Sequence, residues 1–289
     1  MPILISNRGL NGRLKVSGNS TGGFKAKYIV PLLLSLYPGA SVGYSLRKIS
    51  STYTGSAIRV RRSNDNAEQN IGFVNNELDT ASLLTFTGAN SGFVTTWYDQ
   101  SGNANNAVQA TTSLQARIVN AGAITYQNGK PVIDFYGAGI FYTYSPITAT
   151  GDLSLYIVQK RVINTPSVTI SSTSGGPYIG QQSDNNFYIQ RVTGASGFYR
   201  SAADSSAAFC ILEGYTVSSV MSAYKNNIAY TLTAELSFGS TNTSYNSIGN
   251  YNGLAQSTGT VLEIIIYTNN QTSNRSGINT NINSFYTIY

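Results

Sequence analysis

Short segments in which apolar and polar residues alternate recur along most of this chain. Residues 57–61 alternate apolar with arginine side chains, and residues 92–98, 154–158 and 187–192 continue the same period. A period of two places successive side chains on opposite faces of a β-strand, one toward a core and one toward solvent. The sequence therefore predicts a sheet protein, with Arg59 and Arg61 on a solvated strand face.

A few segments depart from this period and predict other local structures. Residues 42–49 carry Leu46 and Ile49 at a helical spacing and predict a short helix. Residues 78–86 follow the pattern of a helix that is capped near Asp79, and residues 278–285 predict an amphipathic helix near the end of the chain. Asn226-Asn227 lies between two apolar segments and predicts a hairpin with a two-residue turn.

The composition excludes several kinds of chemistry. The 289 residues contain no His, which removes imidazole metal ligands, His-dependent nucleophiles and the usual proton shuttle near neutral pH. Cys210 is the single Cys and lies in an apolar segment, so we expect a buried structural thiol and no internal disulfide. No metal site and no cofactor are expected.

Charge is distributed unevenly along the chain. Ten basic residues precede the first acid, Asp65, while the remainder has eight basic and twelve acidic residues. We interpret residues 1–28 as a basic anchoring arm and residues 29–289 as one sandwich domain. The arm residues expected to dock on a partner are Arg8, Arg13, Lys15, Lys25 and Lys27. A solvated arm without a partner is the alternative.

Targeting and membrane signals are not evident in the sequence. The apolar run at residues 1–8 is too short for a secretory signal, and no apolar run is long enough to span a bilayer.

The segment Trp97-Tyr98-Asp99-Gln100-Ser101-Gly102-Asn103 ends an apolar strand with turn-forming residues. Asp99 and Asn103 can hydrogen-bond the nearby backbone, so the segment predicts a rigid turn. Alternation from Phe93 places Trp97 on the buried face of the strand. Asp99 has a functional alternative as a ligand of a sugar hydroxyl or a cation. Asp99, Asn103 and Tyr251 are the candidate carbohydrate-binding residues.

Together with Arg62-Ser63-Asn64-Asp65 and with residues 128–135, Asn-Gly-Lys-Pro-Val-Ile-Asp-Phe, this segment resembles the α-L-arabinofuranosidase B catalytic domain. That family is a branch of the concanavalin A-like lectin/glucanase sandwiches, and the resemblance runs from about Pro38 to Tyr289. It implies an all-β fold, a concanavalin A-like jelly-roll β-sandwich with a few short helices, here preceded by an extended N-terminal arm.

The same resemblance implies where catalytic carboxyl groups should stand. The family's nucleophile is a Glu on a mid-domain strand, but the corresponding residues 177–189 contain Asp184 as their only acid. The family's acid/base is an Asp that follows an Ile-Gly pair, whereas Ile248-Gly249 precedes Asn250 here. A glycosidase needs two carboxyl groups, so we expect no catalytic residues and no hydrolytic activity. Glu263, on an apolar strand, is expected to have a structural hydrogen-bonding role.

These observations predict a non-enzymatic structural virion protein, a tail, fibre or capsid-decorating component made in the host cytoplasm. The expectation rests on similarity to the arabinofuranosidase-like domains of tailed phages. Residues 1–28 would bind other virion proteins, the chain would form a homo-oligomer, and the sandwich would be free to bind a host surface glycan. Membrane insertion and nucleic-acid binding are not expected. The alternatives are a glycoside hydrolase of arabinofuranosidase type with relocated acids, and a host cell-surface adhesion domain.

Overall fold

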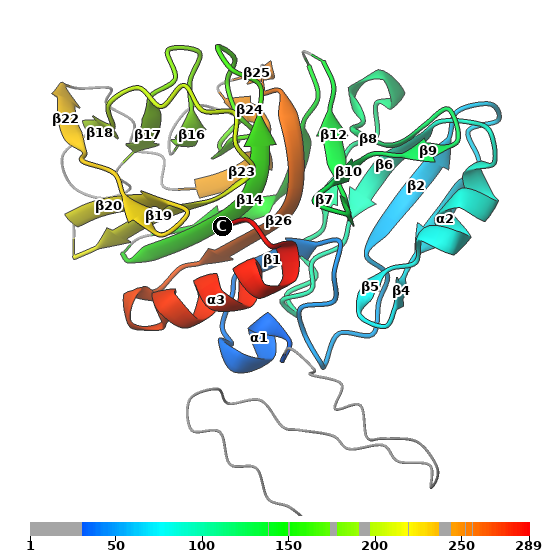
Figure 1. Cartoon of the computed structure of the whole chain (residues 1–289), viewed down its shortest axis with the longest axis horizontal. Coiled ribbons are helices and arrows are strands. Elements are labelled where there is room, and N and C mark those ends of the chain that lie inside the picture. Colours follow the sequence, from blue (N-terminus) through cyan, green and yellow to red (C-terminus); the bar gives the residue numbers. More distant parts are fainter. Residues whose placement is uncertain are drawn as a thin grey trace, which may run out of the picture.

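Antiparallel strands dominate the structure, a computed structural model that describes residues 31–137, 139–149, 151–173, 178–190, 197–218, 220–236, 244–251, 253–255 and 257–289. The strands form a β-sandwich, and a few short helices pack around it (Figure 1). The all-β sandwich predicted from the alternating segments is therefore confirmed. Its membership of the concanavalin A-like superfamily stays a prediction, as does the division of the chain at residue 28.

Hydrogen bonds between strands define two layers. The first layer runs in the order β20 (Val220–Lys225), β19 (Cys210–Val217), β14 (Leu153–Arg161), β26 (Gly259–Tyr267) and β1 (Val42–Ser45). The second runs β22 (Thr233–Leu236), β18 (Gly197–Arg200), β17 (Phe187–Gln190), β16 (Tyr178–Gln181), β15 (Ile170–Ser171), β23 (Ser244–Ile248), β13 (Tyr142–Thr148), β7 (Ala107–Val108), β6 (Gly92–Trp97), β2 (Ile58–Arg62) and β3 (Glu68–Ile71).

Two strands connect these layers along one side. β12 (Ile133–Phe135) pairs with β26 and with β8 (Arg117–Asn120), and β8 pairs in turn with β6. The remaining short elements are β4 (Phe73–Val74), β5 (Glu77–Leu78), β9 (Ala123–Ile124), β10 (Tyr126–Gln127), β11 (Lys130–Pro131), β21 (Ile228–Ala229), β24 (Asn250–Tyr251), β25 (Leu254–Ala255) and the 3₁₀ turns η1 (Thr112–Leu114) and η2 (Thr272–Asn274).

The main core lies between the two layers. Ile157 of β14 and Ile264 of β26 belong to the same buried apolar cluster as Ile179 and Ile189 of the opposite layer. The layers approach closely at Gly214, where a Cβ atom would lie 3.2 Å from the Cδ1 atom of Ile189. Trp97 is fully buried in this cluster, which confirms its predicted position.

A second core covers the outer face of the first layer. The helices α1 (Leu33–Leu36) and α3 (Arg275–Tyr286) pack there, and Figure 1 shows α3 lying across this layer. Ile278 and Ile282 of α3 are buried against Tyr156 and Ile265 of the strands beneath. The predicted C-terminal amphipathic helix is therefore confirmed.

Two other local predictions are confirmed. Helix α2 (Thr80–Thr87) begins after Asp79, whose side chain accepts a hydrogen bond from the Ser82 backbone at 3.0 Å. β20 and β21 form a hairpin, and Asn226 and Asn227 both adopt positive φ angles in its turn, 50° and 67°. No helix in the described part of the chain is long and apolar enough to cross a membrane.

Two predictions are wrong. Residues 42–45 form strand β1 rather than the start of a helix, because Val42 and Tyr44 pair with β26 and are buried between the layers. Arg61 is also buried rather than solvated. Its guanidinium donates to Gln115 Oε1 at 2.8 Å and lies over the ring of Phe93, so partners from other strands and loops replace water.

Candidate functional site

The predicted turn after β6 is built around the carboxylate of Asp99. One of its oxygens, Oδ1, accepts hydrogen bonds from the backbone amides of Gly43 (2.8 Å) and Ser101 (2.9 Å). Oδ2 accepts from Ser101 Oγ (2.7 Å) and from the Asn105 amide (3.1 Å). Asp99 is buried and connects the turn to β1, so its observed contacts are structural.

The other proposed carbohydrate-binding residues do not join Asp99 in one site. Asn103 donates from Nδ2 to the carbonyl oxygens of Ala40 (3.1 Å) and Ser41 (3.0 Å), beside β1. Tyr251 occupies β24, and its side chain lies outside the described residues. No described contact connects Asp99 or Asn103 with β24. The arm residues Arg8, Arg13, Lys15, Lys25 and Lys27 also lie outside the described residues.

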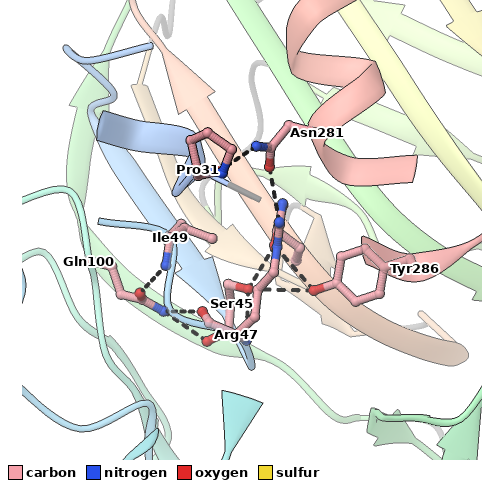
Figure 2. A network of polar contacts seen from close by, with 8 residues as sticks. Pro31, Ser45, Arg47, Ile49, Gln100, Asn281 and Tyr286 are labelled. Carbon is pink, nitrogen blue, oxygen red and sulfur yellow. Dashed lines mark hydrogen bonds and ion pairs between the residues drawn. The ribbon is translucent and has the colours of Figure 1, made fainter. Parts of the chain in front are cut away.

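Glu263 has a structural environment, as predicted. It forms a buried ion pair with Arg47 and also accepts hydrogen bonds from Ser45 Oγ (2.7 Å) and Tyr286 OH (3.1 Å). Figure 2 shows Ser45 at the end of β1, Arg47 just beyond it and Tyr286 of α3 converging. Burial alone would lower the pKa of Arg47, but the charge and hydrogen bonds of Glu263 raise it.

Two further acids are held by arginines. Glu213 of β19 is buried and accepts two hydrogen bonds from Arg275, at 2.9 and 3.1 Å. Asp134 of β12 forms an ion pair with Arg117 of β8 at 2.9 Å. In the described part of the chain, no group of three or more Cys, Asp or Glu side chains is arranged to bind a metal ion.

Asp184 and Asp204 lie on adjacent loops, although they are twenty positions apart in the sequence. Asp184 lies in the turn between β16 and β17, and Asp204 follows β18. The Asp204 amide donates to the carbonyl oxygen of Asn185 at 2.9 Å, which joins the two loops. Arg161 at the end of β14 bridges them, because its Nη2 donates to Asn185 Oδ1 (2.5 Å) and to the carbonyl oxygen of Asp204 (2.7 Å).

The Asp184 carboxylate is exposed but held in one orientation by local donors. Oδ1 accepts from the Asn186 amide at 3.0 Å, and Oδ2 accepts from Asn186 Nδ2 at 3.1 Å and Tyr188 OH at 2.6 Å. Partial burial and the hydrogen bond to Asp184 raise the pKa of Tyr188, so this hydroxyl remains a donor at neutral pH.

The Asp204 carboxylate is partly buried and surrounded by donors. Its Oδ2 accepts from Lys225 Nζ at 2.5 Å and from Tyr230 OH at 2.9 Å, and Oδ1 accepts from the Ser206 amide at 3.0 Å. Burial alone would raise the pKa of Asp204, but the hydrogen bonds from Lys225, Ser206 and Tyr230 lower it below its ordinary value. Asp204 is therefore a carboxylate at neutral pH.

A hollow of about 510 Å³ lies beside the ends of β14 and β26. We call it the β12–β26–β14 hollow, after the strands that supply most of its floor. Its lining includes Tyr126, Asp134, Tyr136, Lys160, Arg161 and Thr260. Arg161 thus contacts the two acidic loops and also lines the hollow.

Sequence reasoning noted Asp184 as the only acid of its segment but did not connect it with Asp204. The sequence signal that was available is the turn Ser183-Asp184-Asn185-Asn186, which places an acid at a strand end. No local pattern marks Asp204, Lys225 or Arg161, because their proximity depends on how β14, β18 and β20 are arranged.

Comparison with known proteins gives two matches and one negative result. Residues 38–132, which are 95 of the 289, match the family described as Alpha-L-arabinofuranosidase B, catalytic. A search of curated proteins gave no significant match. Among solved structures, this chain is similar to an arabinofuranosidase complexed with arabinofuranosyl-α-1,2-xylobiose, with a TM-score of 0.60 and 15% identity over 88% of this chain.

Two GH54 α-L-arabinofuranosidase structures show the same likeness. One was soaked with a cyclic sulfate inhibitor (TM-score 0.59), and one is a mutant soaked with 4-nitrophenyl α-L-arabinofuranoside (TM-score 0.62). Each is 15% identical to this chain, and each match covers 88% of this chain's residues. This chain spans 64% of the length of each of these three proteins.

These matches overturn two predictions, the non-enzymatic structural virion protein and the absence of hydrolytic activity. The matched family is a catalytic domain, and the similar structures are glycosidases rather than virion components. The error was to infer the absence of activity from two motif positions alone, although the fold also places the loops of two other acids, Asp184 and Asp204, next to each other. Virion location, oligomer formation and docking partners stay untested predictions.

By its fold and by the sequence of residues 38–132, this chain is similar to the catalytic domain of α-L-arabinofuranosidase B.

Proposed function

We propose that this protein is a glycoside hydrolase of the arabinofuranosidase type, which cleaves an arabinofuranosyl residue from its substrate. The observation that carries the proposal is the match of residues 38–132 to the arabinofuranosidase B catalytic family, in a chain with the fold of arabinofuranosidases. Glycosidases ordinarily use a pair of carboxyl groups that flank the scissile bond. Asp184 and Asp204, on neighbouring loops joined by a backbone hydrogen bond, are the candidate acids in this chain.

Asp184 has the properties required of the carboxylate that attacks the anomeric carbon or activates water there. It is exposed to an incoming substrate, and hydrogen bonds from Asn186 and Tyr188 fix its orientation. Such hydrogen bonds position a nucleophile and reduce the entropy lost in reaching the transition state.

Asp204 suits a different role. Lys225, Ser206 and Tyr230 hold its carboxylate in the ionised form and lower its pKa, so Asp204 is poorly suited to protonating a leaving group. Hydrolysis should therefore be fastest for substrates whose leaving group departs without protonation. An aryl furanoside such as 4-nitrophenyl α-L-arabinofuranoside is the appropriate first substrate.

The test is release of 4-nitrophenol by the full chain and by Asp184→Asn. We expect turnover by the unchanged chain and a loss of at least about 10²-fold in kcat/KM for the variant. Asp65→Asn is the matched control, because Asp65 is also an exposed carboxylate that accepts a hydrogen bond from the amide two residues later, at 3.1 Å. This control should retain full turnover.

A chemical rescue experiment separates attack by Asp184 from other roles. In Asp184→Ala, azide should enter the space left by the carboxylate and restore cleavage of the 4-nitrophenyl substrate, with an arabinofuranosyl azide as product. Absence of turnover by the unchanged chain on arabinofuranosides would overturn the proposed function. Full turnover by Asp184→Asn would overturn the assigned residue.

A further inference from the structure

One row of side chains crosses the floor of the β12–β26–β14 hollow. Lys160, Thr260, Asp134 and Arg117 occupy successive paired positions on β14, β26, β12 and β8. Asp134 is neutralised by its ion pair with Arg117. Lys160 is exposed and has no ion-pair partner among the described residues, so the row carries an uncompensated positive charge.

Arg161 belongs to the opposite face of β14. Side chains alternate along the strand, so Arg161 shares the inward face of Ile157, whereas Lys160 shares the outward face of Tyr156. The guanidinium of Arg161 donates to the Asn185 side chain and to the Asp204 and Ser206 backbone, away from Lys160. Among the described residues, Lys160 is therefore the unpaired cation that a ligand in the hollow would meet.

The rim of the hollow provides aromatic surfaces. Tyr126 is 52% exposed and Tyr136 is 45% exposed, while the guanidinium of Arg117 lies 4.7 Å from the centre of the Tyr136 ring and holds it. Exposed rings beside a few polar groups, in a hollow of about 510 Å³, match the size and lining of a small-ligand site.

We infer that the β12–β26–β14 hollow binds an acidic glycan, with the carboxylate of a uronic acid residue placed near Lys160. The sugar ring packs against Tyr126 or Tyr136. This binding goes beyond the proposed hydrolysis and does not require it, because Lys160, Tyr126 and Tyr136 lie outside the loops that carry Asp184 and Asp204.

The test compares two ligands that differ only in charge, an oligosaccharide of glucuronic acid and the same oligosaccharide after reduction of its carboxyl groups to neutral alcohols. Binding to the full chain is measured by calorimetry in ~50 mM salt. We expect the acidic ligand to bind at least tenfold more tightly than the reduced ligand. Equal affinities, or competition by inorganic phosphate or single-stranded DNA at similar concentrations, would overturn the inference.

Surface variants then locate the site. Lys160→Gln should weaken the acidic ligand several-fold and leave the reduced ligand unchanged, whereas Tyr126→Ala should weaken both ligands by a similar factor. Lys48→Gln and Tyr289→Ala are matched controls away from the hollow, and Tyr289 has the same 52% exposure as Tyr126. Unchanged affinity in both Lys160→Gln and Tyr126→Ala would overturn the location. Asp184→Asn should bind the acidic ligand normally, which distinguishes this inference from the proposed hydrolysis.

Discussion

Arg47 and Glu263 form a bidentate ion pair inside the molecule, with distances of 2.7 Å from Nε to Oε2 and 2.9 Å from Nη2 to Oε1. The pair joins the segment that follows β1 to β26, and Asn281 Oδ1 of α3 accepts a third hydrogen bond from Arg47 at 2.9 Å. Both side chains are almost completely buried, so removing one partner leaves the other charge without compensation.

Glu263→Gln should therefore destabilise the fold by about 3–5 kcal/mol, because Arg47 would remain buried and charged. Unfolding in urea measures the loss. Glu68→Gln is the control, since Glu68 pairs with Arg59 at the surface and such pairs contribute at most about 1 kcal/mol. Equal effects of the two substitutions would contradict the importance of the buried pair.

Trp97→Ala should cost about 3–5 kcal/mol, because the side chain fills the core between the layers. Trp97 is the only Trp, so intrinsic fluorescence reports on it directly. In the folded protein this fluorescence should resist quenching by acrylamide and change little when glycans are added. Rapid quenching of the native protein would show that the ring is accessible.

Asp99→Ala should lower stability by roughly 3 kcal/mol or more, because it leaves the amides of Gly43, Ser101 and Asn105 without their acceptor. Thermal unfolding measures the loss. Hydrolysis per folded molecule should stay near normal, since Asp99 is buried within its turn. A large loss of kcat in a variant that unfolds at the normal temperature would instead place Asp99 in the active site.

Asp204 should make stability depend on acid pH in a defined direction. Because its pKa is lowered in the folded protein, the native state binds a proton less readily than the unfolded chain, whose Asp pKa is about 3.9. Its contribution is complete above that value and is lost as the pH falls through the lower native pKa. The stability difference between the unchanged chain and Asp204→Asn, measured in urea from pH 6 downward, should shrink on acidification. A constant difference would contradict the lowered pKa.

Cys210 should be inert in the folded protein. It is buried, as the sequence predicted, and burial raises the pKa of its thiol to about 11, so almost no thiolate exists at neutral pH. Iodoacetamide at pH 8 should label the unfolded chain quickly and the native chain only at the rate of unfolding. Fast native labelling would show that β19 opens locally.

Features that depend on local pattern could be predicted from the sequence. Strand β2, helices α2 and α3 and the Asn226-Asn227 hairpin follow from periodicity, capping and turn chemistry within short windows. Strand β1 could not be predicted in this way, because both of its faces are buried and the alternation that marks a half-exposed strand is missing.

The candidate site is less accessible to sequence reasoning than the fold. Asp184 is visible as an acid in a turn, but its nearness to Asp204 depends on a backbone hydrogen bond between loops and on Arg161 from β14. Arg61 shows the same limit, since its burial depends on Gln115, which is 54 positions away in the sequence. Side-chain partners that are distant in sequence leave no periodic pattern.

The position of β26 has a consequence for how this protein is made. β26 begins at Gly259, yet it pairs with β1, β12 and β14, which leave the ribosome much earlier. Until β26 emerges, these strands lack a neighbour, and the apolar residues that it covers stay open to wrong contacts. Folding of the sandwich is therefore completed only after β26 has been synthesised, and a nascent chain of this kind depends on protection from aggregation until then.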